Sequence, residues 1–81
     1  PGIVYCGTQA QTEGVAADLA ARGISARPYH AGLDSATRTR HQQEFNRDEV
    51  QVIAATVAFG MGINKPNIRF VVHYSLPESM E

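Results

Sequence analysis

The stretch QVIAATVAFGMGINKPNIRFVVHY, residues 51–74, decides the fold, because two apolar runs in it flank a loop that contains glycines. Residues 51–56 are almost continuously apolar, which is typical of a strand buried on both faces of a parallel sheet. Residues 68–74 are rich in β-branched and aromatic side chains, which predicts another strand. Between them, Gly60 and Gly62 cost backbone entropy. Either this loop only needs tight turns, or a ligand lies close against its bare backbone.

The sequence before this stretch predicts a strand followed by a helix. Residues 3–6 are apolar, and Thr8 with Gln11 three positions later predicts a capping box, in which each side chain bonds a backbone N–H at the helix start. Gly23 fits the left-handed position just past the helix end. Gly14 lies within the helix, and close packing is the only role we assign to it. The apolar face repeats at helical spacing with Val15, Ala16, Leu19 and Ala20.

A second strand and a polar helix come next. Residues 26–30 predict a short strand, in which Pro28 favours an edge or strand-start position. Asp34 or Ser35 caps the following helix, whose only large apolar side chain is Phe45. Another helix is expected to open within residues 76–81, capped near Ser75. The aromatic side chains are interpreted as core or core-edge residues, namely Tyr5, Phe45, Phe59, Phe70 and Tyr74.

Strands that alternate with helices at these lengths predict an α/β fold, in which right-handed crossovers build a parallel sheet with helices on its faces. Ligands of such sheets bind in the crevice beyond the carboxyl ends of the strands. Three segments leave those ends here, residues 7–9, 30–32 and 56–64, and all three carry glycine and polar side chains. This coincidence is the first indication of a binding site.

Length and composition limit the other classes of function. The 81 residues allow one small domain, and a net charge of −1 lacks the basic excess of a free-standing nucleic-acid-binding protein. One cysteine, Cys6, excludes an internal disulfide and favours a reducing compartment. We see no signal peptide and no apolar stretch long enough to span a membrane. The expected location is therefore intracellular: cytoplasm or nucleoid in a bacterium, nucleus in a eukaryote.

Two strings in the sequence resemble a known family. YHAGLDSATRTRHQQEF, residues 29–45, followed by VIAATVAFGMGINKPNIRFVVHYSLP, residues 52–77, closely resembles the second RecA-like motor domain of RecQ-type DNA helicases in superfamily 2. The resemblance covers essentially the whole chain, residues 1–81, from motif IV to motif V. It implies a partial, three-layer RecA-like helicase C-terminal motor domain, related to the P-loop NTPases. We expect the chain to be a fragment of a longer protein in which motif VI follows residue 81.

The resemblance also implies site residues. Gly62 and Asn64 are expected at ATP, and the position of Asn64 faces the ribose in the family. Gln9 stands where family members commonly carry a basic residue, so this chain lacks the charge for a charge-assisted phosphate contact there. Contacts with the DNA strand are implied at Thr8, Gln9, His30, Gly32, Arg38, Thr56, Gly60 and Gly62.

The implied activity is that of a longer parent protein. It is expected to be an ATP-dependent 3′-to-5′ DNA helicase that unwinds duplex DNA in recombination and repair. By the same resemblance, this chain is expected to supply one wall of the ATP cleft and part of the single-strand track. Single-stranded and duplex DNA, ATP and the first RecA-like domain of the same protein are the expected partners, with no membrane among them.

Catalytic groups are expected elsewhere in that parent. ATP acts with Mg²⁺, whose ligands lie outside this chain, and Zn²⁺ belongs to an accessory domain if the parent has one. Within residues 1–81 we expect no catalytic residue and no metal ligand, so the chain alone should not hydrolyse ATP. His41 and His73 lack Cys or carboxylate partners at ligand spacing.

Several alternatives remain open at the level of sequence. Gly60 and Gly62 could be simple turn glycines, and Lys65 either contacts phosphate or is merely exposed. Cys6 follows a strand and precedes a helix, where phosphatase-like nucleophiles occur, but Thr12 stands where such an enzyme needs arginine. Arg40 is read as surface charge. An RNA helicase motor of the same superfamily, or a non-catalytic α/β module that docks protein partners, are the competing functions.

Overall fold

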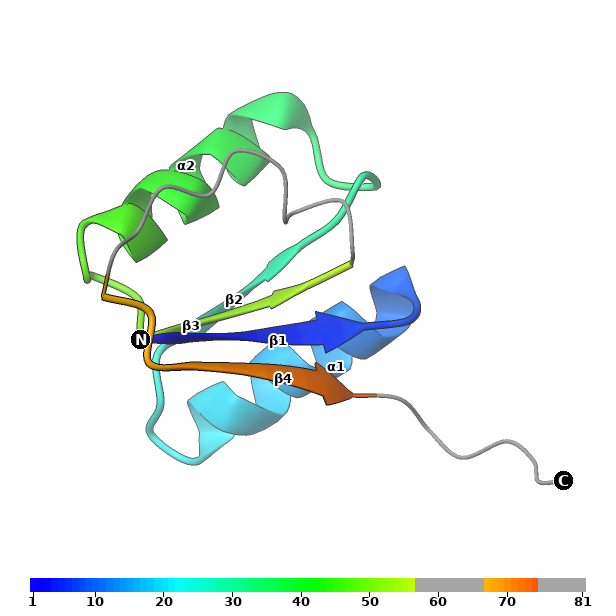
Figure 1. The fold of residues 1–81 in the computed structure, drawn as a ribbon. Helices are drawn as coiled ribbons and strands as arrows, with labels where there is room; N and C mark the ends of the chain where they lie inside the picture. The colour runs from blue at the N-terminus through cyan, green and yellow to red at the C-terminus, as the bar shows by residue number, and fades with distance from the viewer. Residues whose placement is uncertain (57–66, 75–81) are drawn as a thin grey trace, which may run out of the picture.

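The computed structural model describes residues 1–56 and 67–74 of the chain. Strands and helices alternate as the sequence predicts (Figure 1). The first strand is one residue longer than expected and the other three are one or two residues shorter. The helix predicted within residues 76–81, with its cap near Ser75, lies outside the described residues. The described elements are β1 (Gly2–Cys6), α1 (Gln9–Ala21), β2 (Ala26–Tyr29), α2 (Ser35–Asn46), β3 (Val52–Ala55) and β4 (Phe70–Tyr74).

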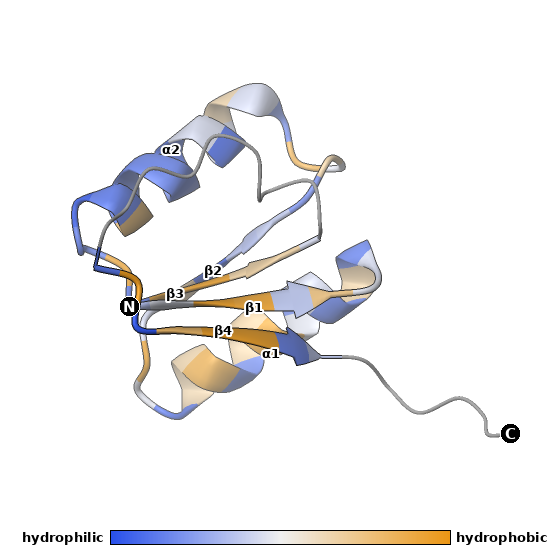
Figure 2. Cartoon of the chain, in the orientation of Figure 1, coloured by the Kyte–Doolittle hydropathy of each residue, from blue (hydrophilic) through white to orange (hydrophobic). Residues whose placement is uncertain are grey.

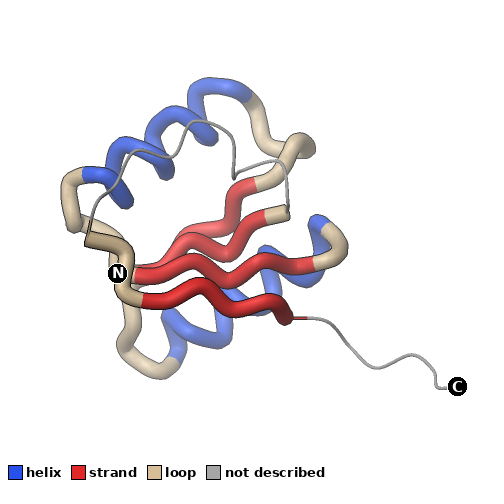
Figure 3. Tube along the Cα trace, in the orientation of Figure 1, coloured by secondary structure: helices blue, strands red, loops and turns tan. Residues whose placement is uncertain are grey.

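The four strands form one parallel sheet in the order β2-β3-β1-β4. The two helices cover opposite faces of this sheet, which gives three layers (Figures 1 and 3). The chain moves outward from β1 to β2 and then back to β3, so right-handed crossovers require helices on opposite faces. The predicted α/β architecture is therefore confirmed.

Side chains of β1 and β3 alternate between two apolar clusters, as the pleat of a strand requires. Ile53 and Ala55 face α2, whereas Val52 and Ala54 face α1, so every residue of β3 is buried. The cluster beneath α2 is built on Ile3, Phe45, Ile53 and Ala55. The cluster beneath α1 is built on Cys6, Ala16, Ala26, Val52 and Ala54.

The two ends of α1 are fixed by local hydrogen bonds. The Gln11 backbone N–H donates to the Thr8 hydroxyl (3.1 Å), which confirms Thr8 as the cap. The Gln11 side chain accepts from the Gly7 N–H rather than from that of Thr8, so the predicted capping box reaches one residue further back. At the other end, Gly23 has φ of +85°, and the Ile24 N–H donates to the Leu19 carbonyl. This is the Schellman end that Gly23 predicts.

The buried face of α1 differs in part from the predicted one. Val15, Ala16 and Leu19 pack in the cluster beneath α1, but Ala20 is exposed. Thr12 is fully buried instead, and its hydroxyl donates to the Gln9 carbonyl at 2.7 Å. That bond satisfies the hydroxyl locally, which is why a polar residue can occupy a core position.

Gly14 is not held by close packing, because a Cβ built on it meets no atom within 4 Å. Gly14→Ala should therefore stabilise the chain by up to about 1 kcal/mol, since alanine is the better helix former. Urea unfolding measures the change. Ala17→Gly, at an exposed position of the same helix, is the matched reverse change and should destabilise by a similar amount. A loss of stability in Gly14→Ala would show that the glycine has a packing role after all.

Helix α2 is largely hydrophilic along its length (Figure 2). Two of its side chains are buried, Phe45 at 0% exposure and His41 at 7%. The His41 Nδ1 lies 2.8 Å from the Pro28 carbonyl, which links α2 to the edge strand β2. Pro28 thus occupies the edge strand that the sequence predicts. Phe45 alone provides the large apolar contact between α2 and the sheet.

Strand β4 is at the opposite edge and is exposed along its whole length. Phe70 and Tyr74, predicted as core or core-edge residues, are 43% and 41% exposed. The prediction is wrong for them because, among the described elements, β1 is the only strand that pairs with β4. The His73 ring stacks on Tyr5 of β1 at 5.4 Å between centroids. No helix in the described part of the chain is both long and apolar enough to cross a membrane.

Candidate functional site

The strand register places the predicted site segments at one edge of the sheet. Tyr5 and Tyr29 both pair with Ala55, so the residues that follow these three positions emerge at the same level. These residues are Cys6, His30 and Thr56. His30 and Thr56 begin two of the three segments singled out from the sequence, and Cys6 directly precedes the third, residues 7–9. The Thr56 N–H donates to the Tyr29 carbonyl at 3.2 Å, which ties two of the segments together.

The segment after β1 forms the N-terminus of α1. Thr8 is the cap and Gln9 is the first helical residue, and both are exposed. The N–H groups of Gln9 and Ala10 have no intrahelical partner, as in the first turn of any α-helix. Together with the helix dipole, such groups favour an anion at this position.

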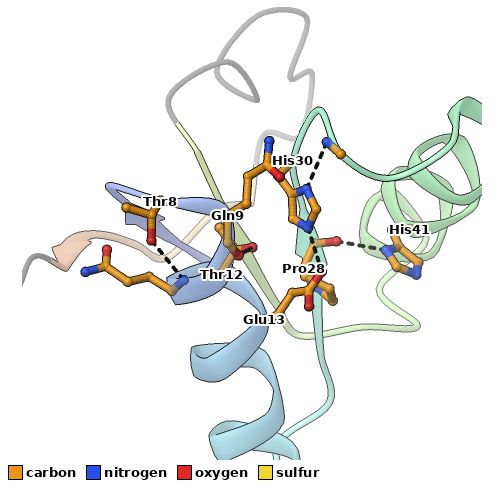
Figure 4. A network of polar contacts seen from close by, with 9 residues as sticks. Thr8, Gln9, Thr12, Glu13, Pro28, His30 and His41 are labelled. Atoms are coloured by element: carbon orange, nitrogen blue, oxygen red, sulfur yellow. Dashed lines mark hydrogen bonds and ion pairs between the residues drawn. The ribbon is translucent and has the colours of Figure 1, made fainter.

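His30, which follows β2, is buried at 5% exposure and has a partner on each side of its ring (Figure 4). Its Nε2 lies 2.8 Å from a carboxylate oxygen of Glu13 on α1. Its Nδ1 accepts from the Gly32 N–H at 3.0 Å. These two contacts hold the His30 ring between α1 and the turn at Gly32. Glu13 was not predicted from the sequence, since only the fold brings the second turn of α1 beside the end of β2.

Gln9 and Gly32 lie against each other. A Cβ built on Gly32 would lie 2.5 Å from the Gln9 Oε1 and 3.0 Å from the His30 Nδ1. The Gln9 side chain points toward His30 in Figure 4. A side chain at position 32 would therefore displace the Gln9 side chain, and the contact between Gln9 and Gly32 joins the segment after β1 to the segment after β2.

The remaining predicted residues are placed less completely. Arg38 lies in the first turn of α2, half-buried, four residues after the cap Asp34. Gly60, Gly62, Asn64 and Lys65 are outside the described residues. The described cluster thus consists of Thr8, Gln9, His30, Gly32 and Thr56, with Glu13 added.

The N-terminus of α2 already holds an anion, the carboxylate of Asp34. The Thr37 hydroxyl donates to one oxygen at 2.6 Å and the Thr37 N–H to the other at 3.2 Å. These two bonds lower the pKa of Asp34 below its ordinary value. A phosphate is therefore favoured at the start of α1 rather than at the start of α2.

The lowered pKa predicts acid sensitivity of α2. A carboxylate whose pKa is lower in the folded chain than in the unfolded chain stabilises the fold at pH values above its unfolded-state pKa of about 3.9. This stabilisation is lost as the pH falls through the pKa of the folded state. The free energy of unfolding should thus fall between pH 5 and pH 3 for this reason among others. Asp34→Asn keeps a capping oxygen but does not titrate, so its loss over this range should be smaller. If urea unfolding shows the same loss of free energy of unfolding in the wild type and in Asp34→Asn, the Asp34 carboxylate is not a source of the acid sensitivity.

Cys6 is buried at 4% exposure, and burial raises the pKa of its thiol. Its Sγ lies 3.9 Å from the Val4 carbonyl, within the cluster beneath α1. A reactive cysteine needs a lowered pKa and access to solvent. Thr12, where a phosphatase would need arginine, is itself buried. Both observations support a structural thiol and oppose the nucleophile.

A parallel sheet between two helices, with polar residues gathered at its carboxyl edge, is the partial RecA-like architecture that the sequence predicts. Residues 1–81 match the family Helicase conserved C-terminal domain, and the chain belongs to this family. A solved structure with the same fold is the S. cerevisiae Dbp5 C-terminal domain, at a TM-score of 0.83 and 25% identity, covering 94% of this chain and 43% of that one.

Within this family the chain is similar to RecQ helicases, which confirms the resemblance stated from its motifs. It is 55% identical over 80 residues to ATP-dependent DNA helicase RecQ of Haemophilus influenzae, and 54% identical to ATP-dependent DNA helicase RecQ of Pasteurella multocida. Each match covers 99% of this chain and 13% of the relative. The chain thus spans a small part of the curated relatives it matches.

Proposed function

We propose that this chain is part of an ATP-dependent 3′-to-5′ DNA helicase of RecQ type that acts in recombination and repair. Its role there is to form part of the single-strand track and one wall of the ATP cleft. The observation that carries this proposal is the contact of Gln9 with Gly32 at the carboxyl edge of the sheet. It joins two of the segments that the resemblance assigns to DNA, in a domain of the helicase family.

The chemistry of the cluster suits a motor that tracks any sequence. The first N–H groups of α1, the Thr8 hydroxyl and the Gln9 amide can all bond phosphate oxygens, and such contacts position a strand without reading its bases. The start of α1 contributes a favourable dipole for an anion. With Gln9 in place of a basic residue, the phosphate contact at this position relies on a neutral donor.

ATP is proposed to contact the segment around Asn64, and the first RecA-like domain of the same protein is proposed to close the cleft. Among the described residues, no group of three His, Cys, Asp or Glu side chains could hold a metal ion. Mg²⁺ and the groups that hydrolyse ATP are proposed for other parts of the helicase, and Zn²⁺ for an accessory domain.

Amide chemical shifts of the isotope-labelled chain test the proposal, first with single-stranded DNA and then with a nonhydrolysable ATP analogue. We expect weak, salt-sensitive DNA shifts at residues 7–9, 32–38 and 56–62, and nucleotide shifts near Asn64. A matched RNA strand in the same titration distinguishes a DNA motor from an RNA motor. DNA shifts confined to the exposed face of α2 would favour a docking module, and unmoved amides at all three segments would contradict the proposed role.

A further inference from the structure

The His30 ring is held between two groups of opposite hydrogen-bonding character. On one side the Glu13 carboxylate can only accept, and on the other the Gly32 N–H can only donate. Both distances are short, at 2.8 Å and 3.0 Å, and the ring itself is buried. A buried ring needs partners for both nitrogens, and here each nitrogen has one.

This arrangement selects one tautomer of His30. Because the Gly32 N–H donates to Nδ1, that nitrogen carries no proton, and the ring proton lies on Nε2 and is donated to Glu13. The other tautomer would set Nδ1–H against the Gly32 N–H and the Nε2 lone pair against a carboxylate. The partner of one ring nitrogen fixes what the other can do. Glu13 thereby prepares Nδ1 to hold the turn at Gly32.

Glu13 has no oppositely charged neighbour within one turn of α1. The positions one turn away on the helix are Gln9, Ala10, Ala16 and Ala17, so no cation there can pair with it. Its side chain is 58% exposed, whereas the His30 side chain is at 5%. The carboxylate thus reaches from a solvated position to a buried ring.

We propose that Glu13 is a positioning residue for the DNA-binding edge and acts through His30 on the turn at Gly32. The position of Gly32 then determines where the Gln9 amide lies, since Gln9 packs directly against Gly32. The effect of Glu13 on DNA binding rests on the proposed function. Its structural part, the link from Glu13 to Gly32, stands on the contacts alone.

The first test uses the free chain and needs no DNA. The ¹⁵N shifts of the His30 ring report its tautomer, and hydrogen exchange of the Gly32 amide reports the turn. Glu13→Ala should mix the tautomers and speed Gly32 exchange by about fivefold or more, since a lost bond raises local opening. Asp18→Ala is the matched control, because it removes the same charge from an exposed site on α1, where Asp18 pairs with Arg22. Equal behaviour of the two variants would overturn the proposal.

Two further variants separate positioning from a general loss of structure. Glu13→Gln keeps an oxygen that can accept from Nε2, so it should retain the wild-type tautomer and slow Gly32 exchange. His30→Asn supplies its own acceptor to the N–H two residues on, as asparagine does in turns. In that background Glu13→Ala should have no further effect on Gly32 exchange. A persistent effect would show that Glu13 acts by another route.

Titration with single-stranded DNA then tests whether the contacts from Glu13 through His30 to Gly32 contribute to DNA binding. Relative to Asp18→Ala, Glu13→Ala should bind DNA about two- to tenfold more weakly, the range expected for one lost hydrogen bond. Glu13→Gln should bind like the wild type. If the wild type binds and Glu13→Ala matches Asp18→Ala, the positioning role is wrong while the proposed function stands. If the wild type shows no DNA shifts, the proposed function fails, and the tautomer and exchange readouts still decide the link.

Discussion

Phe45→Ala is expected to destabilise the chain by about 3–5 kcal/mol, the range for truncating a fully buried aromatic side chain. Phe45 has no exposed surface and is the only large apolar side chain that α2 places against the sheet. Domains of this size have a total stability of only about 0.05–0.15 kcal/mol per residue. The change should therefore lower Tm by about 15 °C or more in a thermal melt followed by circular dichroism, or leave no melting transition.

Phe70→Ala is the matched control, since it makes the same change at a side chain that is 43% exposed on β4. It should cost less, about 1–2 kcal/mol, because nearly half of the Phe70 surface is already in contact with water. If Phe45→Ala lowers the free energy of unfolding by less than about 1 kcal/mol, well below the range for a buried aromatic side chain, the Phe45 contact does not hold α2 on the sheet.

Gly32→Ala is expected to weaken single-stranded DNA binding by about tenfold while leaving the fold intact. The new methyl group would lie 2.5 Å from the Gln9 Oε1 and 3.0 Å from the His30 Nδ1. The exposed Gln9 side chain can swing away, but it then leaves its place at the edge of the sheet. One lost contact with a charged phosphate is worth about 1.5 kcal/mol or more, which corresponds to about a tenfold change in affinity.

Gly7→Ala is the control for this substitution at the same edge of the sheet. Its methyl group would meet only the Gln11 Oε1, at an ordinary contact distance of 3.5 Å. Its affinity for DNA should stay within about twofold of the wild type, well below the effect of losing a hydrogen bond to a charged group. If the two variants bind DNA equally, close packing of Gln9 on Gly32 does not contribute to binding. Thermal melts of both variants check that the fold survives.

Features that depend on neighbouring residues in the chain were predictable from the sequence. The Thr8 cap, the left-handed Gly23 and the buried run of β3 follow from local hydrogen bonding and from patterning. The α/β architecture follows from the alternation of these elements. For the site, the expectation that three segments meet at one edge follows from the parallel order of strands, and the register confirms it for the described parts of those segments.

Features that depend on tertiary position were not predictable. Thr12 reads as a polar helix residue, and only its bond to the Gln9 carbonyl explains its burial. The exposure of Phe70 and Tyr74 depends on β4 lying at an edge, which composition does not reveal. Glu13 could be linked to His30 only through the fold. Two residues 17 positions apart leave no periodic signal, although a lone carboxylate without a cation one turn away was a hint.

The place of β1 in the sheet has a consequence for how the chain folds during synthesis. Residues 2–6 lie between β3 and β4, yet they pair with residues 52–55 and 70–74, which leave the ribosome much later. Of these four strands β1 is made before the others and must wait unpaired, and sheets closed by such distant pairings fold slowly. Deleting residues 1–5 would remove most of β1, the strand that pairs with both β3 and β4, so this small truncation should prevent folding altogether.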